Sequence, residues 1–545
     1  MKHWRNLLAL ILALAMIFTL AACGGGSSAP KEEEAKTEEP AEEAPAEEEA
    51  PAEEEPAEEE PAAEEPAADE DSTIVVGTLD TSDTFDPCVA SVCRLGLMMV
   101  FDTVLKLDYD TQEVMPCIAT DWEWEDDTTL KLTIRDDAVF SNGDVLQPSD
   151  VLYSLSRFVF ENNMFDPGYD NIDFDNCTID GQVLTLKLFS MDADFLYKLA
   201  NDQWASVVCE KYVKENPDAW WNAPCGSGPY VCDENVEGSH SSYTLRDSYW
   251  GEMPDAKHVT IQHYTEATTM IADFENGALD VALVVPEDDY LAALDGAYGD
   301  DVQTKLFPSY DVLSVQLPEY NPVFDDINVR RAIAKAINFE TFAQAVYGSL
   351  GSVADSMLIP NMAYYKSIGI PEYDPEGAKE LLAEAGYPDG MDMLLVIPST
   401  PSNEAAAVVL QAFLKEVNIN LTVESYDFPT AIPILMRNGT DISIGGTGGG
   451  TYLASQLFDT ISQYTTNGAA RVTDPEFNGY LDDASGEMED SVRADLYGKA
   501  QQWVFDNCRT LPVGYSEAAV LYHGNITNVT GLVARTIDIE LLRFS

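Results

Sequence analysis

Hydrophobic and polar residues alternate along several short segments of this chain, as they do in half-buried β-strands. Alternation across residues 130–134 and again across 184–188 predicts two strands of this kind. An apolar stretch at 74–79 predicts a further strand.

Three longer segments show the spacing of amphipathic helices. In the first, Asn328 is the expected N-cap of a helix whose apolar face holds Val329, Ala332, Ile333, Ala336 and Ile337. A second helix is expected to start at Asp374-Pro375 and to stop at Gly386, and a third to span about 491–506. Strands and helices intermix along the chain, so the pattern predicts an α/β fold.

The chain begins with a different pattern. Lys2 and Arg5 precede an apolar run at 7–20, and the small residues that follow end in Cys23. The run is shorter than the roughly 20 residues that a membrane-spanning helix needs. We therefore interpret 1–22 as a lipoprotein signal peptide and Cys23 as a lipidation site. Two acyl chains on Cys23 would hold the mature protein at the outer face of a cell membrane, extracellular or periplasmic. The alternative is a simple anchor helix.

Residues 23–72 have the composition of a spacer. After a glycine-rich start the segment is almost entirely Glu, Ala and Pro, with prolines at roughly every fifth position from Pro40 to Pro66. A proline inside a helix costs about 3 kcal/mol, which argues against a single long Glu/Ala helix. The sequence predicts a disordered, acidic tether.

The formal net charge is −67, from 96 acidic and 29 basic residues. Only part of it lies in the tether, so residues 73–545 are acidic as well. Nucleic acids and anionic lipid surfaces require a basic footprint, and we expect neither as a partner.

Eight cysteines follow Cys23, an even number that permits disulfides in an exported protein. Their spacing leaves the connectivity open among Cys88, Cys93, Cys117, Cys177, Cys209, Cys225, Cys232 and Cys508. Cys225 and Cys232 bracket a turn and form the simplest local bridge. There is no Cys-x-x-Cys motif and the histidines are scattered, so we expect no metal site.

Enzyme motifs are missing from the sequence. It contains no Gly-x-Ser-x-Gly, no His-Glu-x-x-His and no phosphate-binding Gly-x-x-x-x-Gly-Lys-Ser/Thr. The glycine-rich run at 445–450 lacks the spacing and the lysine of a phosphate loop. We expect neither catalysis nor a cofactor.

Several motifs occur in a fixed order and identify a family resemblance. Ala119-Thr120-Asp121-Trp122-Glu123-Trp124 is followed by a strand and by Phe140-Ser141-Asn142-Gly143-Asp144. The other matches are Thr84-Phe85-Asp86-Pro87, Gly226-Ser227-Gly228-Pro229-Tyr230, Asn276-Gly277-Ala278-Leu279-Asp280, Asn328-Val329-Arg330-Arg331-Ala332-Ile333 and the helix from Asp374 to Tyr387. Residues 73–545 resemble the bacterial extracellular solute-binding proteins of family 5, which serve ABC importers of oligopeptides, dipeptides and nickel.

The resemblance implies a periplasmic-binding-protein-like fold in which two lobes, joined by a hinge, close on a ligand cleft. It places lobe I at 73–107, 221–309 and 511–545, an additional domain inserted in lobe I at 108–220, and lobe II at 310–510. The implied partners are a small-molecule or peptide ligand and the permease subunits of an ABC transporter, and we expect a monomer.

The sequence departs from its relatives in the ligand loop. Peptide-binding members carry a Gly-Trp-x-x-Asp-Tyr segment whose Asp pairs with the α-ammonium group of the peptide. The resemblance places Thr447 at the Trp position and Gly450 at the Asp position, while Asp459 lies too far along unless the loop shifts. Unpairing a buried ammonium group costs several kcal/mol, so we expect weak binding of unmodified peptides and favour ligands without a free α-ammonium, such as blocked or cyclic peptides or sugar-like solutes.

Other cleft residues follow from position in the family. Arg94 and Arg471 are candidate partners of a ligand carboxylate, with a structural salt bridge as the alternative for each. For the aromatic residues, packing at the hinge is the alternative. The predicted ligand-binding residues are Ser91, Val92, Cys93, Arg94, Phe307, Tyr310, Thr447, Gly448, Gly450, Arg471 and Tyr515.

Two other functions remain open: a sensory lipoprotein that presents the same solute to a signalling receptor, and a surface hydrolase. The missing catalytic motifs argue against the hydrolase.

Overall fold

The computed structural model describes residues 72–80, 84–90, 94–109, 111–161, 167–447, 452–465, 468–531 and 536–545. The chain divides into two compact units, 1–66 and 67–545. The predicted signal peptide, Cys23 and nearly all of the predicted tether lie outside the described residues. The names lobe I, lobe II and inserted domain are used below for the residue ranges given above.

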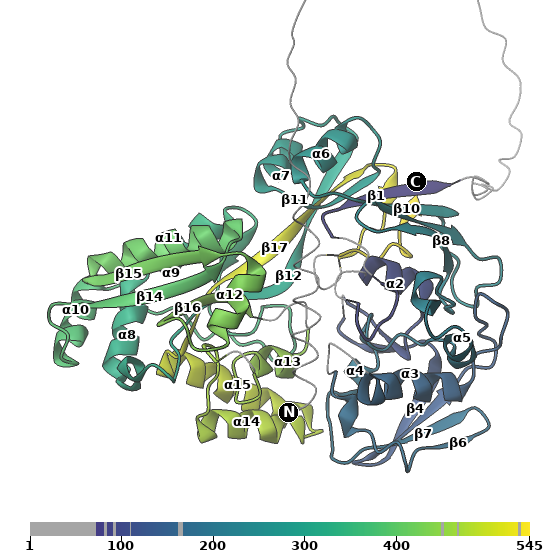
Figure 1. Ribbon diagram of the computed structural model, residues 1–545, viewed down its shortest axis with the longest axis horizontal. Helices are drawn as coiled ribbons and strands as arrows, with labels where there is room; N and C mark the ends of the chain where they lie inside the picture. The colour runs from purple at the N-terminus through teal and green to yellow at the C-terminus, as the bar shows by residue number, and fades with distance from the viewer. Residues whose placement is uncertain are drawn as a thin grey trace, which may run out of the picture. The chain divides into compact units, whose positions relative to one another are not determined.

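One large mixed sheet runs through the second unit (Figure 1). Near its centre β1 pairs in parallel with both β10 and β11, and the other pairings of named strands are antiparallel. Its strands are, in spatial order, β16 (Ser443–Thr447), β12 (Val302–Gln316), β17 (Thr510–His523), β11 (Val281–Val285), β1 (Thr73–Thr78), β10 (His258–His263), β9 (His240–Leu245) and β8 (Tyr230–Val236), and β13 (Gly351–Val353) also pairs with β17.

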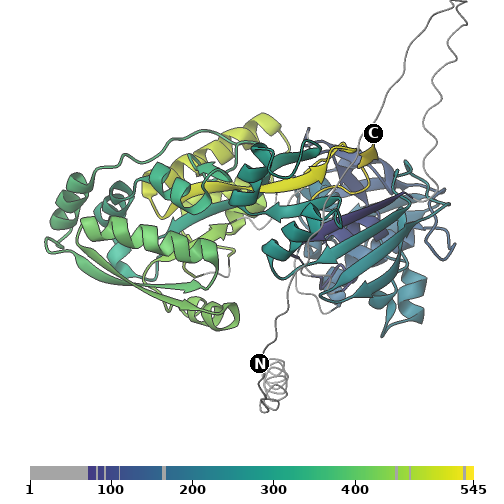
Figure 2. The same ribbon diagram turned by 90° about the horizontal axis from the view of Figure 1, so that it is seen from above.

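The two longest strands connect the lobes. β12 and β17 pair along most of their length, and both predicted boundaries between the lobes fall inside them. In Figure 2 the yellow β17 passes from the green helices of lobe II toward the purple β1 of lobe I. The pairing shifts register between Pro308 and Val312, where Tyr310 has a φ of 52°. An L residue with positive φ locally breaks the extended strand conformation.

Lobe II surrounds a core that includes Leu313, Ile333, Leu395 and Leu410. Its parallel strands β14 (Met391–Pro398) and β15 (Ile419–Tyr426) pair with each other, and its helices include α8 (Ile327–Ala336), α9 (Phe339–Tyr347), α10 (Pro375–Glu384), α11 (Pro401–Glu416) and α12 (Phe428–Leu435).

The predicted helix ends in lobe II are partly right. Asp374 caps α10 and Gly386 follows its end with a φ of 98°, as expected. The expected N-cap at Asn328 is wrong. The side chain of Asp326 accepts the hydrogen bond from the Asn328 N–H at 2.8 Å, so α8 begins at Ile327. Both Asp and Asn suit this position, and the backbone turn at Asp326 decides between them.

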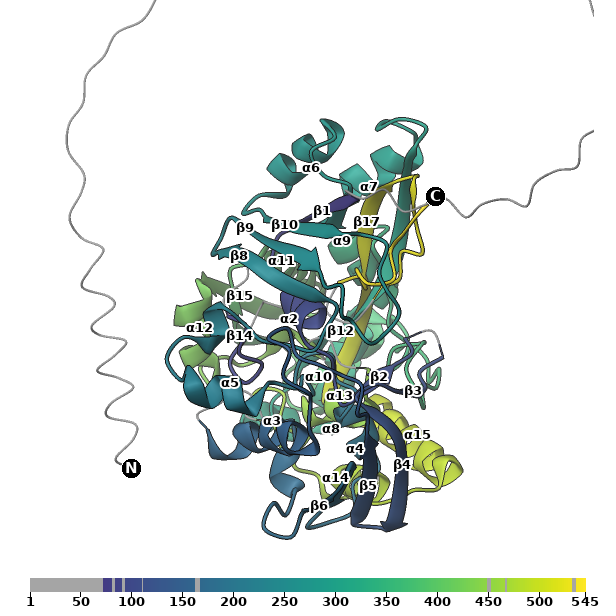
Figure 3. The ribbon, with the colours of Figure 1, turned by 90° about the vertical axis from the view of Figure 1, so that its right-hand side faces the viewer.

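The inserted domain contains a four-stranded antiparallel sheet, and Figure 3 shows three of its strands, β4, β5 and β6, near α3 and α4. Its two central strands confirm the alternation patterns at 130–134 and 184–188. The sheet consists of β4 (Ala119–Asp126), β5 (Thr129–Ile134), β7 (Val183–Lys187) and β6 (Thr178–Asp180). The domain also contains α3 (Pro148–Phe160), between β5 and β6 in the chain, and α4 (Phe195–Lys198) and α5 (Glu210–Glu215) after β7.

The remaining helices that matter for the site lie in both lobes. They are α2 (Arg94–Val100) in lobe I and α13 (Ala454–Asp459), α14 (Pro475–Ser485) and α15 (Asp490–Asn507) in lobe II. This mixture of strands and helices confirms the predicted α/β class. Within the described ranges, no helix combines the length and apolarity needed to cross a bilayer.

Cys225 and Cys232, the simplest local pair, are not bridged in this structure. Both residues are free thiols. Cys232 lies on β8, where its Sγ hydrogen-bonds to the carbonyl of Glu234 at 3.6 Å, while Cys225 interacts with Cys209. Nearness in sequence is a poor guide here, because tertiary packing decides which thiols become neighbours.

Candidate ligand-binding site

The inserted domain and lobe II touch each other through polar contacts. The N–H of Ala193 donates to the carbonyl of Ser485 at 3.0 Å, and the hydroxyl of Tyr452 donates to the carbonyl of Tyr197 at 3.0 Å. Arg493 and Asp194 add an ion pair. These contacts join α4 and its flanking residues to the segments around α13, α14 and α15.

Arg493 is the most buried cation in this contact, and its surroundings hold it charged. Its guanidinium also donates to the hydroxyl of Tyr364 at 3.0 Å and to the carbonyl of Ala484 at 3.2 Å. Burial alone would lower the pKa of Arg493, but the neighbouring Asp194 carboxylate outweighs burial and raises it. Arg493 therefore stays charged where it meets Asp194.

Tyr452 of lobe II packs against the inserted domain. Its ring is 4% exposed and makes an edge-on contact with Tyr109 at 6.0 Å and a tilted contact with Tyr197 at 6.3 Å. The Tyr109 hydroxyl in turn donates to Asp202 at 3.0 Å. Lobe II thus inserts an aromatic side chain into a polar and aromatic face of the inserted domain.

A cavity of about 390 Å³ lies between these two parts. Asp170, Asp192, Asp194 and Lys198 line it from the inserted domain, and Ser455, Gln456, Asp459, Tyr464, Leu481, Asp482, Ser485 and Tyr497 line it from lobe II. A volume of this size matches the lower range of small-molecule sites.

The charges around this cavity do not cancel. Lys198 pairs with Asp192 at 2.7 Å, and Asp194 pairs with Arg493. The other three lining carboxylates, Asp170, Asp459 and Asp482, form no ion pair with a described residue. The cavity therefore has an excess of negative charge, which attracts a cation.

Asp459 is the most perturbed of these carboxylates. Its surface is accessible to the cavity, yet protein surrounds it on most sides, and this loss of solvation raises its pKa to about 6. Lys198 opposes the rise, while Asp194 and Asp482 add to it. A carboxylate held in this way gains a favourable partner when a cation enters.

Two hydroxyls at the wall of the cavity are buried without a well-formed hydrogen bond to any described residue. They are the Tyr497 hydroxyl, which lies beside the Arg493 guanidinium, and the Ser455 Oγ. Buried polar atoms are normally satisfied, so such atoms beside a cavity are available to a ligand or to water. Tyr497 is held by stacking on Phe458, with ring centroids 6.0 Å apart.

The structure gives Arg94 a protein partner. Its Nε donates to Asp202 at 2.9 Å, and its side chain is largely buried. Arg471 is exposed and forms no ion pair with a described residue. Of the two predicted cationic ligand contacts, only Arg471 has a charge left unpaired within the described ranges.

The predicted aromatic residues are packed against protein. Phe307 is 8% exposed in the lobe I core, beside Lys305. The Tyr310 hydroxyl accepts a hydrogen bond from Asn361 at 3.2 Å. The Tyr515 hydroxyl donates to the carbonyl of Leu358 at 3.0 Å and accepts from the N–H of Ser356 at 3.0 Å, which fixes the segment after β13.

The loop residues predicted for the site are mostly outside the described ranges. Ser91, Val92, Cys93, Gly448 and Gly450 belong to this group, and Thr447 is described only as the last residue of β16, paired with Val312. Their assignment to the ligand stays a prediction.

Most residues of the acidic cavity were missed by sequence reasoning. Asp192 and Asp194 lie almost 300 positions from Asp482, and no local spacing joins them. In a chain with 96 acidic residues no single carboxylate stands out. The sequence offers Asp459 as an anchor for a ligand ammonium group only if the loop shifts. Its position on α13 brings it to the cavity.

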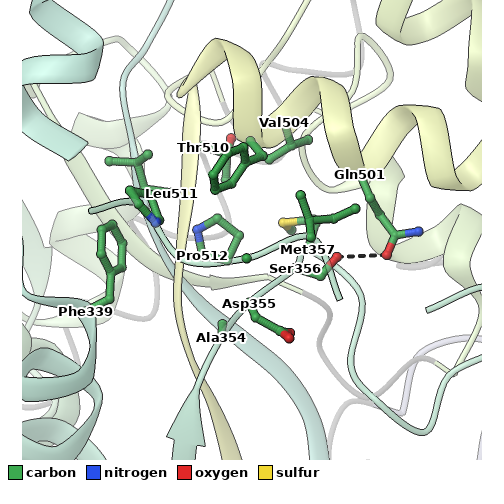
Figure 4. A pocket seen from close by; sticks show the side chains of 14 residues that line it. Phe339, Ala354, Asp355, Ser356, Met357, Gln501, Val504, Thr510, Leu511 and Pro512 are labelled. Atoms are coloured by element: carbon green, nitrogen blue, oxygen red, sulfur yellow. Dashed lines mark hydrogen bonds between the residues drawn. The ribbon is translucent and has the colours of Figure 1, made fainter. Parts of the chain in front are cut away.

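A second, smaller cavity lies within lobe II (Figure 4). It has a volume of about 20 Å³, enough for about one water molecule, between β17, α15 and the segment after β13. The Ser356 hydroxyl donates to Gln501 at 2.8 Å at its edge, and the Thr510 hydroxyl has no hydrogen bond to a described residue. This space is too small for a solute. No group of His, Cys, Asp or Glu in the described part of the chain is arranged to hold a metal ion.

A large central sheet, two long strands that run from one lobe to the other, and a cavity between two parts of one chain define an α/β solute-binding protein. Residues 113–469 match the model of the bacterial extracellular solute-binding proteins, family 5 (middle region). The chain belongs to this family.

Its curated relatives are distant but similar over most of their length. The chain is 25% identical to the probable ABC transporter periplasmic-binding protein SapA of Escherichia coli (strain K12) over 495 residues, covering 84% of this chain and 89% of that protein. It is 24% identical to heme-binding protein A of Haemophilus influenzae over 456 residues, covering 76% and 82%.

Solved structures share the fold. The dipeptide-binding protein of Pseudoalteromonas sp. SM9913, in complex with Met-Leu, superposes with a TM-score of 0.75 at 22% identity, covering 87% of this chain and 100% of that one. HbpA2 of Haemophilus parasuis gives a TM-score of 0.76 at 19% identity, covering 87% and 100%. These likenesses confirm the predicted periplasmic-binding-protein-like fold.

Proposed function

We propose that this protein is a lipid-anchored substrate-binding protein of an ABC importer, which captures a small solute between its lobes and delivers it to a membrane permease. The observation that carries the proposal is the cavity of about 390 Å³ between the inserted domain and lobe II. The contacts around it connect parts that a hinge at β12 and β17 can separate. Ligand that binds the closed state better than the open state shifts the population toward closure.

The charge of the cavity indicates the class of solute. Asp170, Asp459 and Asp482 lack cationic partners within the described residues, and Tyr497 and Ser455 offer hydroxyl groups. We infer that the ligand is a small organic solute with a cationic group, such as an amine or a guanidine, directed at this acidic wall. A charge-assisted hydrogen bond contributes about 1.5–3 kcal/mol, roughly tenfold to a hundredfold in affinity.

The charge of the cavity does not by itself fix the chemical class of the ligand. The names of the relatives include peptide, heme and nickel binding, so the shared fold accommodates different solutes. The glycine at position 450 supports the prediction that unmodified di- and tripeptides bind weakly through the ligand loop. The acidic cavity supplies a different place for a positive charge, for example a side-chain amine of a blocked peptide.

Calorimetry with matched ligand pairs tests the ligand class. Each pair consists of a small amine-bearing solute or blocked Lys- or Arg-containing peptide and its acetylated, uncharged counterpart. We expect binding of at least one cationic member, at least tenfold weaker binding of its neutral counterpart, and loss of the difference in Asp482→Asn. Asp483→Asn is the matched control, because Asp483 is the next residue on α14 and does not line the cavity. Preference for the neutral members would refute the cationic ligand, and micromolar binding of several free peptides would restore an ordinary peptide importer.

Membrane anchoring is tested separately with Cys23→Ser. The variant should lose its lipid and move from the membrane fraction to the soluble fraction, because acyl chains are the expected attachment. A variant that still sediments with membranes after a high-salt wash would contradict the lipoprotein assignment.

The alternative role, presentation of the same solute to a signalling receptor, makes a different prediction. Deletion of the gene should abolish uptake of the radiolabelled solute if the protein serves an importer. Unchanged uptake with loss of a transcriptional response to the solute would favour sensing.

A further inference from the structure

Two of the described cysteines meet in the interior. Cys209 is the N-cap residue of α5, and Cys225 lies between the short helix η2 (Trp220–Asn222) and β8. Their exposures are 2% and 5%, and both belong to the same hydrophobic cluster. The two thiols are neighbours and each acts on the ionisation of the other, and the structure holds both as free cysteines.

The other described thiols have different surroundings. Cys177, Cys232 and Cys508 each hydrogen-bond to a backbone carbonyl, at 3.3, 3.6 and 3.3 Å. Cys88 and Cys117 are buried, and burial raises the pKa of both. Among the described cysteines, Cys209 and Cys225 are the two whose thiols interact with each other.

The backbone holds both cysteines in place. On the Cys209 side, the N–H of Glu210 donates to the Asp150 carboxylate at 2.9 Å. On the Cys225 side, the carbonyl of Gly226 accepts from the N–H of Ser141 at 2.9 Å and from the Arg246 guanidinium at 3.1 Å. A Cβ at Gly226 would lie 1.8 Å from the carbonyl oxygen of Val100, so this segment is also tightly packed. These contacts hold the two segments in place with their thiols side by side, and a disulfide would join the sulfurs at about 2.05 Å.

The surroundings also differentiate the two sulfur atoms. The Cys209 thiol, the Ser141 hydroxyl and the backbone N–H of Asn142 face the Cys225 sulfur, and together they lower its pKa despite burial. The pKa of Cys209 is raised, first by its hydrogen bond to Cys225 and then by burial. Cys225 is thus the thiol whose thiolate is better stabilised.

We propose that Cys209 and Cys225 form a structural disulfide in the exported protein. The inference relies on the proposed extracytoplasmic location, where disulfides persist. It does not depend on the ligand or on the importer.

The oxidation is a thiol–disulfide exchange with an oxidised dithiol protein of the compartment. The thiolate of one cysteine attacks one sulfur of the donor disulfide, which breaks that bond and forms a mixed disulfide. The thiolate of the other cysteine then attacks the protein sulfur of the mixed disulfide and releases the donor as a dithiol. Two protons leave the cysteines and two electrons pass to the donor. Because both sulfurs are buried in the folded protein, the exchange takes place as the chain folds, before the cluster closes.

The bond closes a loop that contains α5 and η2, and it connects the end of the inserted domain to the strand β8 of lobe I. A cross-link of this loop length restricts the unfolded chain. We expect reductant to lower the melting temperature of the oxidised protein by about 3–6 °C.

Peptide mapping by mass spectrometry tests the proposal. The full chain is isolated from the extracytoplasmic side of the producing cells and its free thiols are blocked with N-ethylmaleimide in denaturant without reductant. We expect a cross-linked pair of peptides containing Cys209 and Cys225, whereas Cys232 and Cys508 carry the label. Complete labelling of both Cys209 and Cys225, or a bond from either one to another cysteine, would overturn the proposal.

Variants separate this bond from a general effect of reductant. Cys209→Ser should leave Cys225 open to labelling, and Cys225→Ser should leave Cys209 open. The melting temperature of the double variant should no longer respond to reductant, while that of the control Cys232→Ser should respond as the parent does. A response retained by the double variant would count against the bond.

If the protein is retained in the cytoplasm, the proposed location is refuted, and the disulfide is tested on the purified protein instead. The purified, reduced protein is then unfolded and refolded with oxidised glutathione. Selective formation of the Cys209–Cys225 bond supports the proposal under these conditions, and its absence refutes it.

Discussion

Arg493 on α15 forms an ion pair with Asp194, the N-cap residue of α4, although the two residues are 299 positions apart in the chain. The pair joins lobe II to the inserted domain at the edge of the acidic cavity. Both side chains are less than a tenth exposed. A buried pair of this kind contributes to the closed state only while both partners are present.

Removal of the Arg493 cation should therefore favour the open state. Arg493→Gln leaves the Asp194 carboxylate buried and unpaired, which costs about 3–5 kcal/mol, so we expect at least a tenfold loss of ligand affinity. Calorimetry measures the affinity and small-angle X-ray scattering measures closure on ligand addition. Lys499→Gln is the control on the same helix, because its ion pair with Asp495 is exposed and contributes little. Equal affinities of the two variants would show that the buried pair has no role in closure.

Asp459 should make the binding of a cation dependent on pH. Its pKa of about 6 means that the carboxylate becomes charged as the pH rises through 6. We expect affinity for the cationic ligand to increase between pH 5 and pH 7 in the parent protein and to change much less in Asp459→Asn. Titration calorimetry at several pH values measures the difference. A parallel pH profile of parent and variant would assign the dependence to another group.

The same carboxylate should lower the stability of the ligand-free protein. A folded-state pKa above the unfolded value of about 3.9 means that folding disfavours the charged form. The penalty is absent below about pH 4, grows as the pH rises, and is complete above the folded-state pKa. Asp459→Asn should thus melt about 1–3 °C higher than the parent at pH 7.5 and at the same temperature at pH 4. Asp483→Asn serves as the control, and a lower melting temperature of Asp459→Asn at pH 7.5 would contradict this assignment.

Two substitutions of Tyr452 distinguish the contribution of its hydrogen bond to ligand affinity from the contribution of its ring packing. Tyr452→Phe loses the bond to the Tyr197 carbonyl, worth about 1 kcal/mol, and keeps the ring contacts with Tyr109 and Tyr197. We expect roughly fivefold weaker ligand binding in Tyr452→Phe and a much larger loss in Tyr452→Ala, which removes the ring from a buried site. Calorimetry again provides the measurement. Similar losses in both variants would indicate that the hydroxyl, and not the ring, determines closure.

The acidic N-terminal segment should be dispensable for stability. Its composition predicts a spacer without buried contacts, so deletion of residues 30–71 should leave the melting temperature of the remaining protein unchanged within error. Differential scanning calorimetry on soluble forms that begin after Cys23 compares the two lengths. A decrease of several degrees on deletion would show that the segment packs against the body.

The sequence by itself determined the features that depend on neighbouring residues. The cap at Asp374 and the stop at Gly386 define α10 within one stretch of chain, and the alternation at 130–134 defines the face of β5 that is buried. The ordered motifs from Thr84 to Tyr387 identified the family, and with it the fold. Such signals are local because hydrogen bonds near helix ends and the two-residue period of a strand involve residues close in sequence.

Only the tertiary structure decided which distant residues meet. The thiol beside Cys225 is that of Cys209 and not that of Cys232, which is nearer in sequence and whose Sγ bonds to the carbonyl of Glu234. Asp194 and Asp459 come to one cavity from α4 and α13, and no spacing in a chain rich in acids distinguishes them beforehand. The pKa of Asp459 depends on the desolvation that this arrangement produces. Burial and electrostatic potential are properties of the packed whole, so the charge of the site appears only once the lobes are in contact.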